Sequence, residues 1–475
     1  MDFVARDLTM SNCCDDVGQV NRIDILPDDV LLGIFDFYVE MEMDSLYNFK
    51  RWTEEWQTLV HVCRRWRCLM FGSPRRLNLQ LVCSPSTPAR DTLNVWPALT
   101  LIIYGTITRS GTDNVVAALE KSNRVCRVGL MGFAGWQLEQ VLAAMQVPFP
   151  ELTDLELSSN GETMPVIPDS FLDGSALRLR HFQLDGIPFP GLRKLHLSAT
   201  HLVELWLTNI PHSGYISPEA IVPLISPLSS LKILSLGFQS PQSGPDRETR
   251  PSPPSKRSVM PALHRLSFKG VIEYLEDLVT GIDAPQLDDL YITFFNQIDF
   301  DTPRLSQFIN RTPKLGKHDA SVLFYDDIAR VGLSPGTLRI EISCREPDWQ
   351  FSSIEQVCNS SLHPVSTVED LYIQYAYWQL VWENDAIGNA LWLQLLLPFT
   401  AVKNLYLSKE FAPGIAAALQ ELVGGRITEV LPSLENIFVQ GLERSGPFQE
   451  KIRKFVEARQ LLSNHSIAIS VWESR

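Results

Sequence analysis

The stretch "FPELTDLELSSN" (149–160) places apolar residues in the order L-x-x-L-x-L, at Leu152, Leu155 and Leu157. The last two alternate with polar residues, which is typical of a short β-strand with one buried face. The same pattern, with other apolar residues allowed, returns in "LRHFQL" (179–184), "LRKLHL" (192–197), "LVELWL" (202–207), "LKILSL" (231–236), "LHRLSF" (263–268), "LDDLYI" (287–292), "VEDLYI" (368–373), "VKNLYL" (402–407) and "LENIFV" (434–439), and more weakly in "VCRVGL" (125–130) and "LTLIIY" (99–104). A unit repeated this often decides the fold class.

The copies recur at steps that leave room for a helix between strands. The early first positions 99, 125, 152 and 179 are 26 or 27 residues apart, and most later steps are 24–34 residues. Between them lie stretches with apolar spacings of three and four, which predict helices: "NVVAALEKS" (114–122), "QLEQVLAAMQ" (137–146), "VIEYLEDLVT" (271–280) and "GIAAALQELVGG" (414–425). One strand and one helix cannot bury their own apolar faces, whereas stacked copies can. The copy at 192 is out of step, and 293–367 fits the pattern poorly.

This pattern resembles the leucine-rich-repeat family in an irregular form. The Asn or Cys that usually follows the third Leu is mostly absent, although "LSSN" (157–160) is close. The resemblance implies an α/β fold, an irregular, horseshoe-like solenoid of strand/helix repeats over residues 92–472. Segment 240–258, rich in Pro, Ser and charge, is expected to be a disordered loop within it. The alternative is an ordinary α/β domain with amphipathic strands.

A second feature lies near the N-terminus, where two stretches carry more apolar groups than short helices need for themselves. In "LPDDVLLGIFDFY" (26–38), Pro27 and the acids Asp28 and Asp29 suit a first helical turn. Apolar groups follow at helical spacing there and again in "WQTLVHVCRRWRCLM" (56–70). Because two or three short helices form a very small core, this surplus of apolar surface predicts a module that binds a partner.

These residues resemble the F-box family, whose pattern is Leu-Pro, two acidic or polar residues, an aliphatic pair and Ile-Phe, then an aliphatic residue, Cys or Ser, a basic pair and Trp. The resemblance covers a short helical domain at 22–75, ahead of the repeats, and implies docking on a Skp-type adaptor that links the chain to a cullin and a RING subunit. It assigns adaptor docking and packing to Leu26, Pro27, Val30, Leu31, Ile34, Phe35, Val62, Cys63 and Trp66. The spacer 36–59 is longer than in most members, and with "WQTLVHVCRRWR" it resembles fungal members.

Three arginines of the second stretch, Arg64, Arg65 and Arg67, leave two readings open. They pair with an acidic adaptor surface, or they form a solvated helix face. The aromatic-rich segment 372–399 is equally ambiguous, because aromatic residues serve both recognition patches and packed cores.

Composition excludes several classes of function. The 475-residue chain has a formal net charge of -14, which argues against binding of a nucleic-acid phosphate backbone. Its eight cysteines include no C-x-x-C pair, which favours reduced thiols. Residues 1–21 are polar and acidic without an apolar leader, and apolar stretches such as 391–399 are too short to span a bilayer. We therefore expect a disordered N-terminus (1–21), a cytoplasmic or nuclear location, and no membrane or nucleic-acid partner.

Motifs for nucleophilic, phosphate-binding or metal-dependent chemistry are absent from the sequence, so we expect no catalytic, cofactor-binding or metal-binding residues. The predicted function is a non-catalytic substrate-receptor subunit of an SCF-type ubiquitin ligase, whose F-box docks on the Skp-type adaptor and whose repeats bind a protein substrate. One alternative is a leucine-rich-repeat scaffold or binding protein with no ligase role. Another is a hydrolase on an α/β fold, which the missing nucleophile motifs disfavour.

Overall fold

A computed structural model describes most of the chain. The described residues are 25–40, 49–74, 76–159, 161, 164–189, 198–241, 257–295, 300–315, 319–334, 337–359, 363–375, 388–423, 426–441, 447–463 and 466–472. The predicted disorder at 1–21, residues 242–256 of the predicted loop and the copy at 192–197 lie outside them. At the end of that loop, Ser258 and Val259 form a short strand, β8 (Ser258–Val259), which pairs in parallel with β10 (Ile282–Asp283).

The chain forms two compact units. The first includes the described residues up to Val82 together with Val95–Thr100, and the second includes Cys83–Asn94 and the chain from Leu101 onward. The first unit holds α1 (Asp28–Glu40), α2 (Phe49–Val62), α3 (Arg64–Gly72) and most of β1 (Gln80–Cys83). Among the described residues, no helix of either unit is long and apolar enough to cross a membrane.

A small aromatic core holds the first unit together. Trp56 of α2 is buried, and its ring lies against those of Phe71 and Trp96, with centroid distances of 6.3 and 5.4 Å. Its Nε1–H donates to the main-chain oxygen of Gln80 at 3.1 Å, so the polar atom of the indole is satisfied. Leu31 and Phe35 of α1 are also buried, so one arc of α1 belongs to this core.

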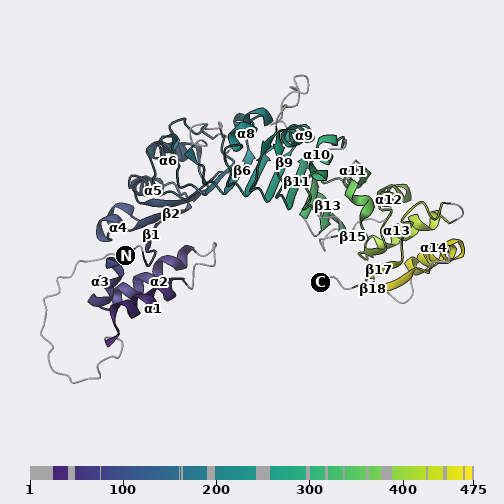
Figure 1. Ribbon diagram of the computed structural model, residues 1–475, viewed down its shortest axis with the longest axis horizontal. Coiled ribbons are helices and arrows are strands. Elements are labelled where there is room, and N and C mark those ends of the chain that lie inside the picture. The colour runs from purple at the N-terminus through teal and green to yellow at the C-terminus, as the bar shows by residue number, and fades with distance from the viewer. Residues whose placement is uncertain are drawn as a thin grey trace. The chain divides into compact units, whose positions relative to one another are not determined.

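The second unit is a mixed α/β structure built on an open, mostly parallel sheet that has 16 strands when β1 is included (Figure 1). From β2 onward the strand order is β2-β3-β4-β5-β6-β7-β9-β11-β14-β13-β12-β15-β16-β17-β18. The strands are β2 (Thr100–Thr106), β3 (Val125–Met131), β4 (Asp154–Ser158), β5 (His181–Asp185), β6 (Glu204–Ile210), β7 (Ile233–Phe238), β9 (Arg265–Gly270), β11 (Asp289–Phe295), β12 (Asp319–Phe324), β13 (Ile328–Ser334), β14 (Thr337–Ser343), β15 (Asp370–Tyr375), β16 (Asn404–Leu407), β17 (Asn436–Gln440) and β18 (Ala468–Trp472).

Helices separate many of these strands and lie along one face of the sheet (Figure 1). They are α4 (Ala89–Val95), α5 (Thr112–Leu119), α6 (Gly135–Ala144), α8 (Pro218–Ile225), α9 (Ile272–Gly281), α10 (Pro303–Asn310), α11 (Pro347–Asn359), α12 (Asn389–Leu396), α13 (Ala412–Glu421) and α14 (Pro447–Ser463). The four helices predicted from apolar spacing correspond to α5, α6, α9 and α13, with ends shifted by up to four residues. The predicted α/β class is confirmed.

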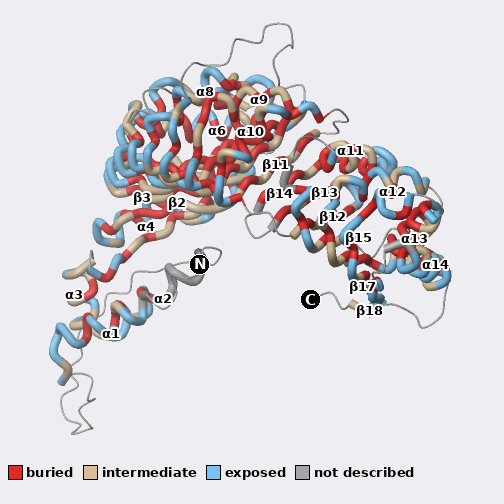
Figure 2. Tube along the Cα trace, turned by 45° about the vertical axis from the view of Figure 1, so that its right-hand side comes forward, coloured by how far each residue is buried: buried red, intermediate tan, exposed pale blue. Residues whose placement is uncertain are grey.

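The L-x-x-L-x-L residues form the core of this unit. Leu152, Leu155 and Leu157 are all buried, while Asp154, Glu156 and Ser158 between and beside them are partly exposed. Equivalent buried residues stand side by side in the parallel register, as Leu155, Phe182, Leu205 and Leu234 do across β4 to β7. Figure 2 shows buried residues along the strands and on the neighbouring helices of this unit. Alternation along strands such as β4, β5, β9, β11 and β12 therefore leaves one face of the sheet covered and the other open.

An antiparallel insert interrupts the repeated order in the region where the sequence pattern was poor. Strands β12, β13 and β14 follow one another as a meander, with β13 antiparallel to both neighbours. The last of them, β14, pairs in parallel with β11, whereas the first, β12, pairs in parallel with β15. The spatial order of the three strands is thus the reverse of their order in the sequence.

Cysteine reactivity offers a check on this packing. Burial raises the pKa of Cys126 in β3 to about 11 and that of Cys358 in α11 to about 12, whereas Cys68 of α3 is exposed. At pH 8 about one in a thousand of these buried thiols or fewer are thiolates. We expect iodoacetamide at pH 8 to modify Cys68 and to spare Cys126 and Cys358, as read by peptide mass mapping. In urea all three should react; modification of Cys126 in the native chain would contradict the packing of β3.

Candidate functional site

Hydrogen bonds connect the start of α1 to α3 through Asp28 and Arg65, which are 37 residues apart in the sequence. Arg65 donates from Nε and a terminal nitrogen to Oδ1 of Asp28, at 3.0 and 2.6 Å, and to the main-chain oxygen of Leu26 at 2.6 Å. The Cys63 sulfur accepts from the backbone N–H of Trp66 at 3.5 Å and so caps the first turn of α3. These contacts explain why acidic, cysteine and arginine residues stand at these positions.

The nine residues assigned to adaptor binding divide by exposure. Leu31 and Phe35 are buried, and the Phe35 ring lies 4.8 Å from that of Trp66, so packing within the unit accounts for them. Leu26, Cys63 and Trp66 are half-buried. Pro27, Val30, Ile34 and Val62 are exposed. Within this set, these four side chains are the most available to a partner.

An apolar stripe runs along the exposed side of α1. It consists of Val30, Ile34, Phe37 and Tyr38, with exposed fractions of 42, 48, 64 and 39%. At 100° per residue these four positions fall within an arc of about 100°, next to the arc that carries buried Leu31 and Phe35. Val62 at the end of α2 is a further exposed apolar residue, at 58%. Phe37 and Tyr38 follow from the same helical spacing, although the family pattern does not include them.

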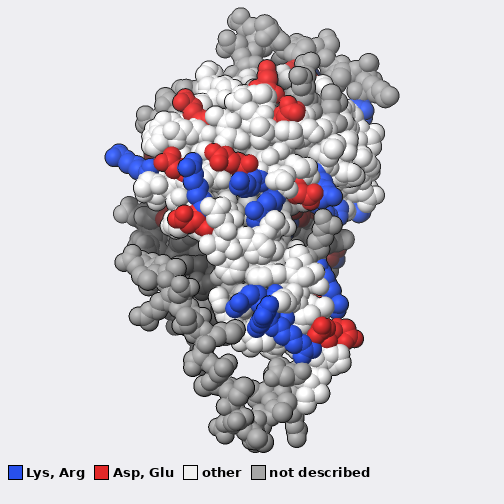
Figure 3. Space-filling model, turned by 90° about the vertical axis from the view of Figure 1, so that its left-hand side faces the viewer, with Lys and Arg blue, Asp and Glu red and all other residues white. Residues whose placement is uncertain are grey.

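The arginines of α3 are mostly used inside the unit. Arg65 is paired with Asp28, and Arg67 donates to the main-chain oxygen of Val60 at 2.9 Å. Arg64 is exposed. Both interpretations of the three arginines therefore stay open, although Arg65 and Arg67 each make a bond within the unit. On the side of the molecule that Figure 3 shows, basic and acidic side chains are interspersed over the upper part.

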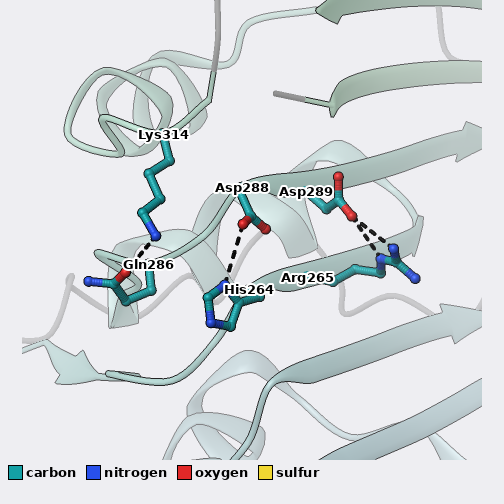
Figure 4. Close-up of polar contacts among 6 residues, drawn as sticks. All are labelled: His264, Arg265, Gln286, Asp288, Asp289 and Lys314. Carbon is teal, nitrogen blue, oxygen red and sulfur yellow. Dashed lines mark hydrogen bonds and ion pairs between the residues drawn. The ribbon is translucent and has the colours of Figure 1, made fainter. Parts of the chain in front are cut away.

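The open face of the sheet in the second unit is the other candidate surface. On its N-terminal half, polar side chains bond across neighbouring strands: Asp185 accepts from Ser158 and Thr208, and His181 lies 3.1 Å from Glu204. Near the start of β9 and β11, Arg265 pairs with Asp289 at 2.9 Å, and His264 lies 3.4 Å from Asp288 (Figure 4). These polar side chains therefore hydrogen-bond or pair with one another across the strands.

Towards the C-terminal half, stacked aromatic rings accompany such polar contacts, which continue there from Asn404 to Asp370. The rings of Tyr372, Tyr406 and Phe438 stack in sequence on β15, β16 and β17, with centroid distances of 4.2 and 4.6 Å and interplanar angles of 9°. We name these three stacked rings the aromatic ladder. The ring of Trp472 in β18 lies against it, with its centroid 5.7 Å from that of Tyr406. All four residues are half-buried, and burial raises the pKa of the Tyr372 phenol to about 12, which keeps it neutral.

The aromatic-rich segment 372–399 thus has two roles. Tyr372 belongs to the open face, whereas Trp392 of α12 is buried in the core against Phe351 at 4.6 Å. Residues 376–387, which include Tyr377, Trp378 and Trp382, lie outside the described part of the chain.

One row of open-face residues crosses the insert. Strand register aligns Tyr291, Arg339, Gly332, Ser321, Tyr372, Tyr406 and Phe438 from β11 to β17, and we name this set the central row. Its smallest members, Gly332 and Ser321, stand between Arg339 and Tyr372. A pocket of about 310 Å³ lies there, lined also by Asp319 and Arg330. The pocket exists because two small residues from adjacent strands meet between two large ones.

The sequence of this chain was also compared with known proteins. No protein-family model matches it, and no curated protein matches it.

Proposed function

We propose that this chain is the substrate-receptor subunit of an SCF-type ubiquitin ligase. In this proposal the first unit is an F-box that docks on a Skp-type adaptor and through it on a cullin, in the cytoplasm or the nucleus. The second unit is an irregular leucine-rich-repeat solenoid, interrupted by β12–β14, that binds a protein substrate. The strand–helix order and the buried L-x-x-L-x-L residues support the second assignment.

The observation that carries the proposal is the exposed apolar stripe of α1. A helix whose apolar arc is already half used in its own core still exposes Val30, Ile34 and Phe37. Fully burying a side chain of this kind contributes roughly 1.5–3 kcal/mol, and helix faces recognised in grooves present anchors at this spacing. Exposed apolar surface of this kind marks a site of protein interaction.

The function needs no catalytic group on this chain. Two binding surfaces on one polypeptide turn the encounter of a substrate with the ligase into a nearly intramolecular event, which raises the effective concentration of the substrate near the reacting enzyme. Several titratable groups of the open face are used in ladders between strands, among them Asp185, His181 and Arg265, which fits a binding surface.

Copurification tests this proposal. Full-length chain, co-expressed with a Skp-type adaptor, is expected to elute with it as a stoichiometric complex in size-exclusion chromatography. An adaptor that elutes alone at micromolar concentrations of both proteins would overturn the ligase assignment and favour the scaffold without a ligase role.

A further inference from the structure

The pocket of the central row lies on the open face that the proposed function uses for substrate, so the following inference rests on that function. We propose that this pocket receives an anionic side chain of a substrate segment that crosses strands β14 to β16, while an apolar or aromatic residue of the same segment packs on the aromatic ladder.

Arg339 is the residue that selects an anion. Its guanidinium carbon lies 4.7 Å from the centroid of the Tyr291 ring, a cation–π contact that holds the planar group against the sheet. Among the described residues, no carboxylate lies within ion-pair distance of Arg339, although the side chain is half-buried. A half-buried guanidinium with no counter-ion recognises a carboxylate or phosphate group.

The other charges that line the pocket are positioned differently. Arg330 is already paired with Glu341 at 2.6 Å and donates to the Tyr325 hydroxyl at 2.9 Å. Asp319 stands opposite Asp370 of β15 in the strand register, in the row of residues next to the central row. The positive charge that has no ion pair among the described residues is therefore on the Arg339 side of the pocket.

The aromatic ladder fixes the second feature of the ligand. Tyr372 is both a wall of the pocket and the first ring of the ladder. It lies three strand positions from Arg339 in the sheet order, which at about 4.8 Å per strand is about 14 Å, or about four residues of extended chain. The predicted ligand is thus a peptide segment with an acidic or phosphorylated residue. An aromatic residue or proline lies about four residues before or after it.

Peptide selection on the full-length chain tests this inference. A display library of random 12-residue peptides is expected to yield sequences enriched in Asp or Glu with an aromatic residue or proline about four positions away. One selected peptide is then synthesised with Glu, Gln, phosphoserine or serine at the anionic position, and its affinity is measured by fluorescence anisotropy. The Glu and phosphoserine forms should each bind at least about tenfold more tightly than the Gln and serine forms; the stronger of the two identifies the anion.

Two variants and one matched control locate the site. Arg339→Glu is expected to lower the affinity for the acidic peptide at least about tenfold. Ser321→Leu fills the pocket without changing charge and should lower this affinity to a similar extent. Lys269→Glu changes the same charge on the same face outside the pocket and should leave affinity within about twofold. No acidic enrichment, or an acidic peptide that binds both pocket variants as well as the parent, overturns the inference. Adaptor copurification does not involve this pocket, so failure of either proposal is recognised separately.

Discussion

Val30→Glu with Ile34→Glu is expected to lower the affinity of the full-length chain for a Skp-type adaptor by at least about a hundredfold. Both side chains are exposed in the free chain, at 42 and 48%, so their burial must come from a partner. Losing two partly buried apolar anchors costs about 3 kcal/mol, which corresponds to about two orders of magnitude in Kd, and a carboxylate placed against an apolar groove adds a desolvation cost. Isothermal titration calorimetry with purified adaptor measures the effect.

The matched control for this double change lies in the same unit. Val95 is 79% exposed, and Val95→Glu introduces one such carboxylate on an exposed apolar residue without touching the α1 stripe. It should bind adaptor like the parent chain, and circular dichroism should show the same helical content in all three proteins. Adaptor affinity that survives the double change with the helices intact would show that the stripe is not the docking surface.

Gly186→Ala is expected to destabilise the second unit by about 3–5 kcal/mol, the largest effect on stability that we predict. Gly186 follows β5 with φ +69°, a conformation that side chains with a Cβ rarely adopt. A Cβ at this position would lie 2.1 Å from the main-chain oxygen of Ser159, and that oxygen belongs to a backbone that cannot simply rotate away. The Gly186 N–H also donates to the main-chain oxygen of Thr208 at 3.0 Å, so a shift of Gly186 disturbs the next strand as well.

Gly441→Ala separates the two causes of that effect. Gly441 has a similar φ of +62°, but an added Cβ would meet nothing within 4 Å. Its cost should be about 1 kcal/mol, the price of the backbone conformation alone. Urea unfolding followed by circular dichroism compares the two variants; equal shifts of the midpoint would contradict a steric cause at Gly186.

Local patterns in the sequence are sufficient to predict most strands of the second unit. Leu155 and Leu157 alternate with polar residues. Their burial can be predicted from this alternation alone, without knowing which strand lies beside them. Helix α9 is similarly predicted, because its apolar spacing selects one face. These features depend on residues that are close in sequence.

The antiparallel insert is not predictable in this way. Strands β12, β13 and β14 follow one another without a helix, so the spacing of the repeat is lost. Their reversed order depends on the pairing of β14 with β11 and of β12 with β15, which are contacts between distant parts of the chain. The pocket has the same origin, since Ser321 and Gly332 meet Arg339 and Tyr372 only through this register.

The first unit shows a different limit. Val30 and Leu31 are adjacent and similarly apolar, yet one is exposed and the other is buried. The sequence predicts an apolar helix, but which arc enters the core depends on the position of Trp66 and the rest of α3. For this reason the predicted adaptor set mixes residues of the core with residues of the surface.

The reversed insert also bears on how the chain folds. In β2 to β7 each strand pairs with the strand before it in sequence, so structure can propagate from one neighbour to the next with short loop closures. At β11 this progression stops, because its next partner, β14, is synthesised only after β12 and β13. The segment before β12 can therefore assemble as one cooperative block. The segment from β15 onward either pairs with β12 after the meander is complete or nucleates independently of it.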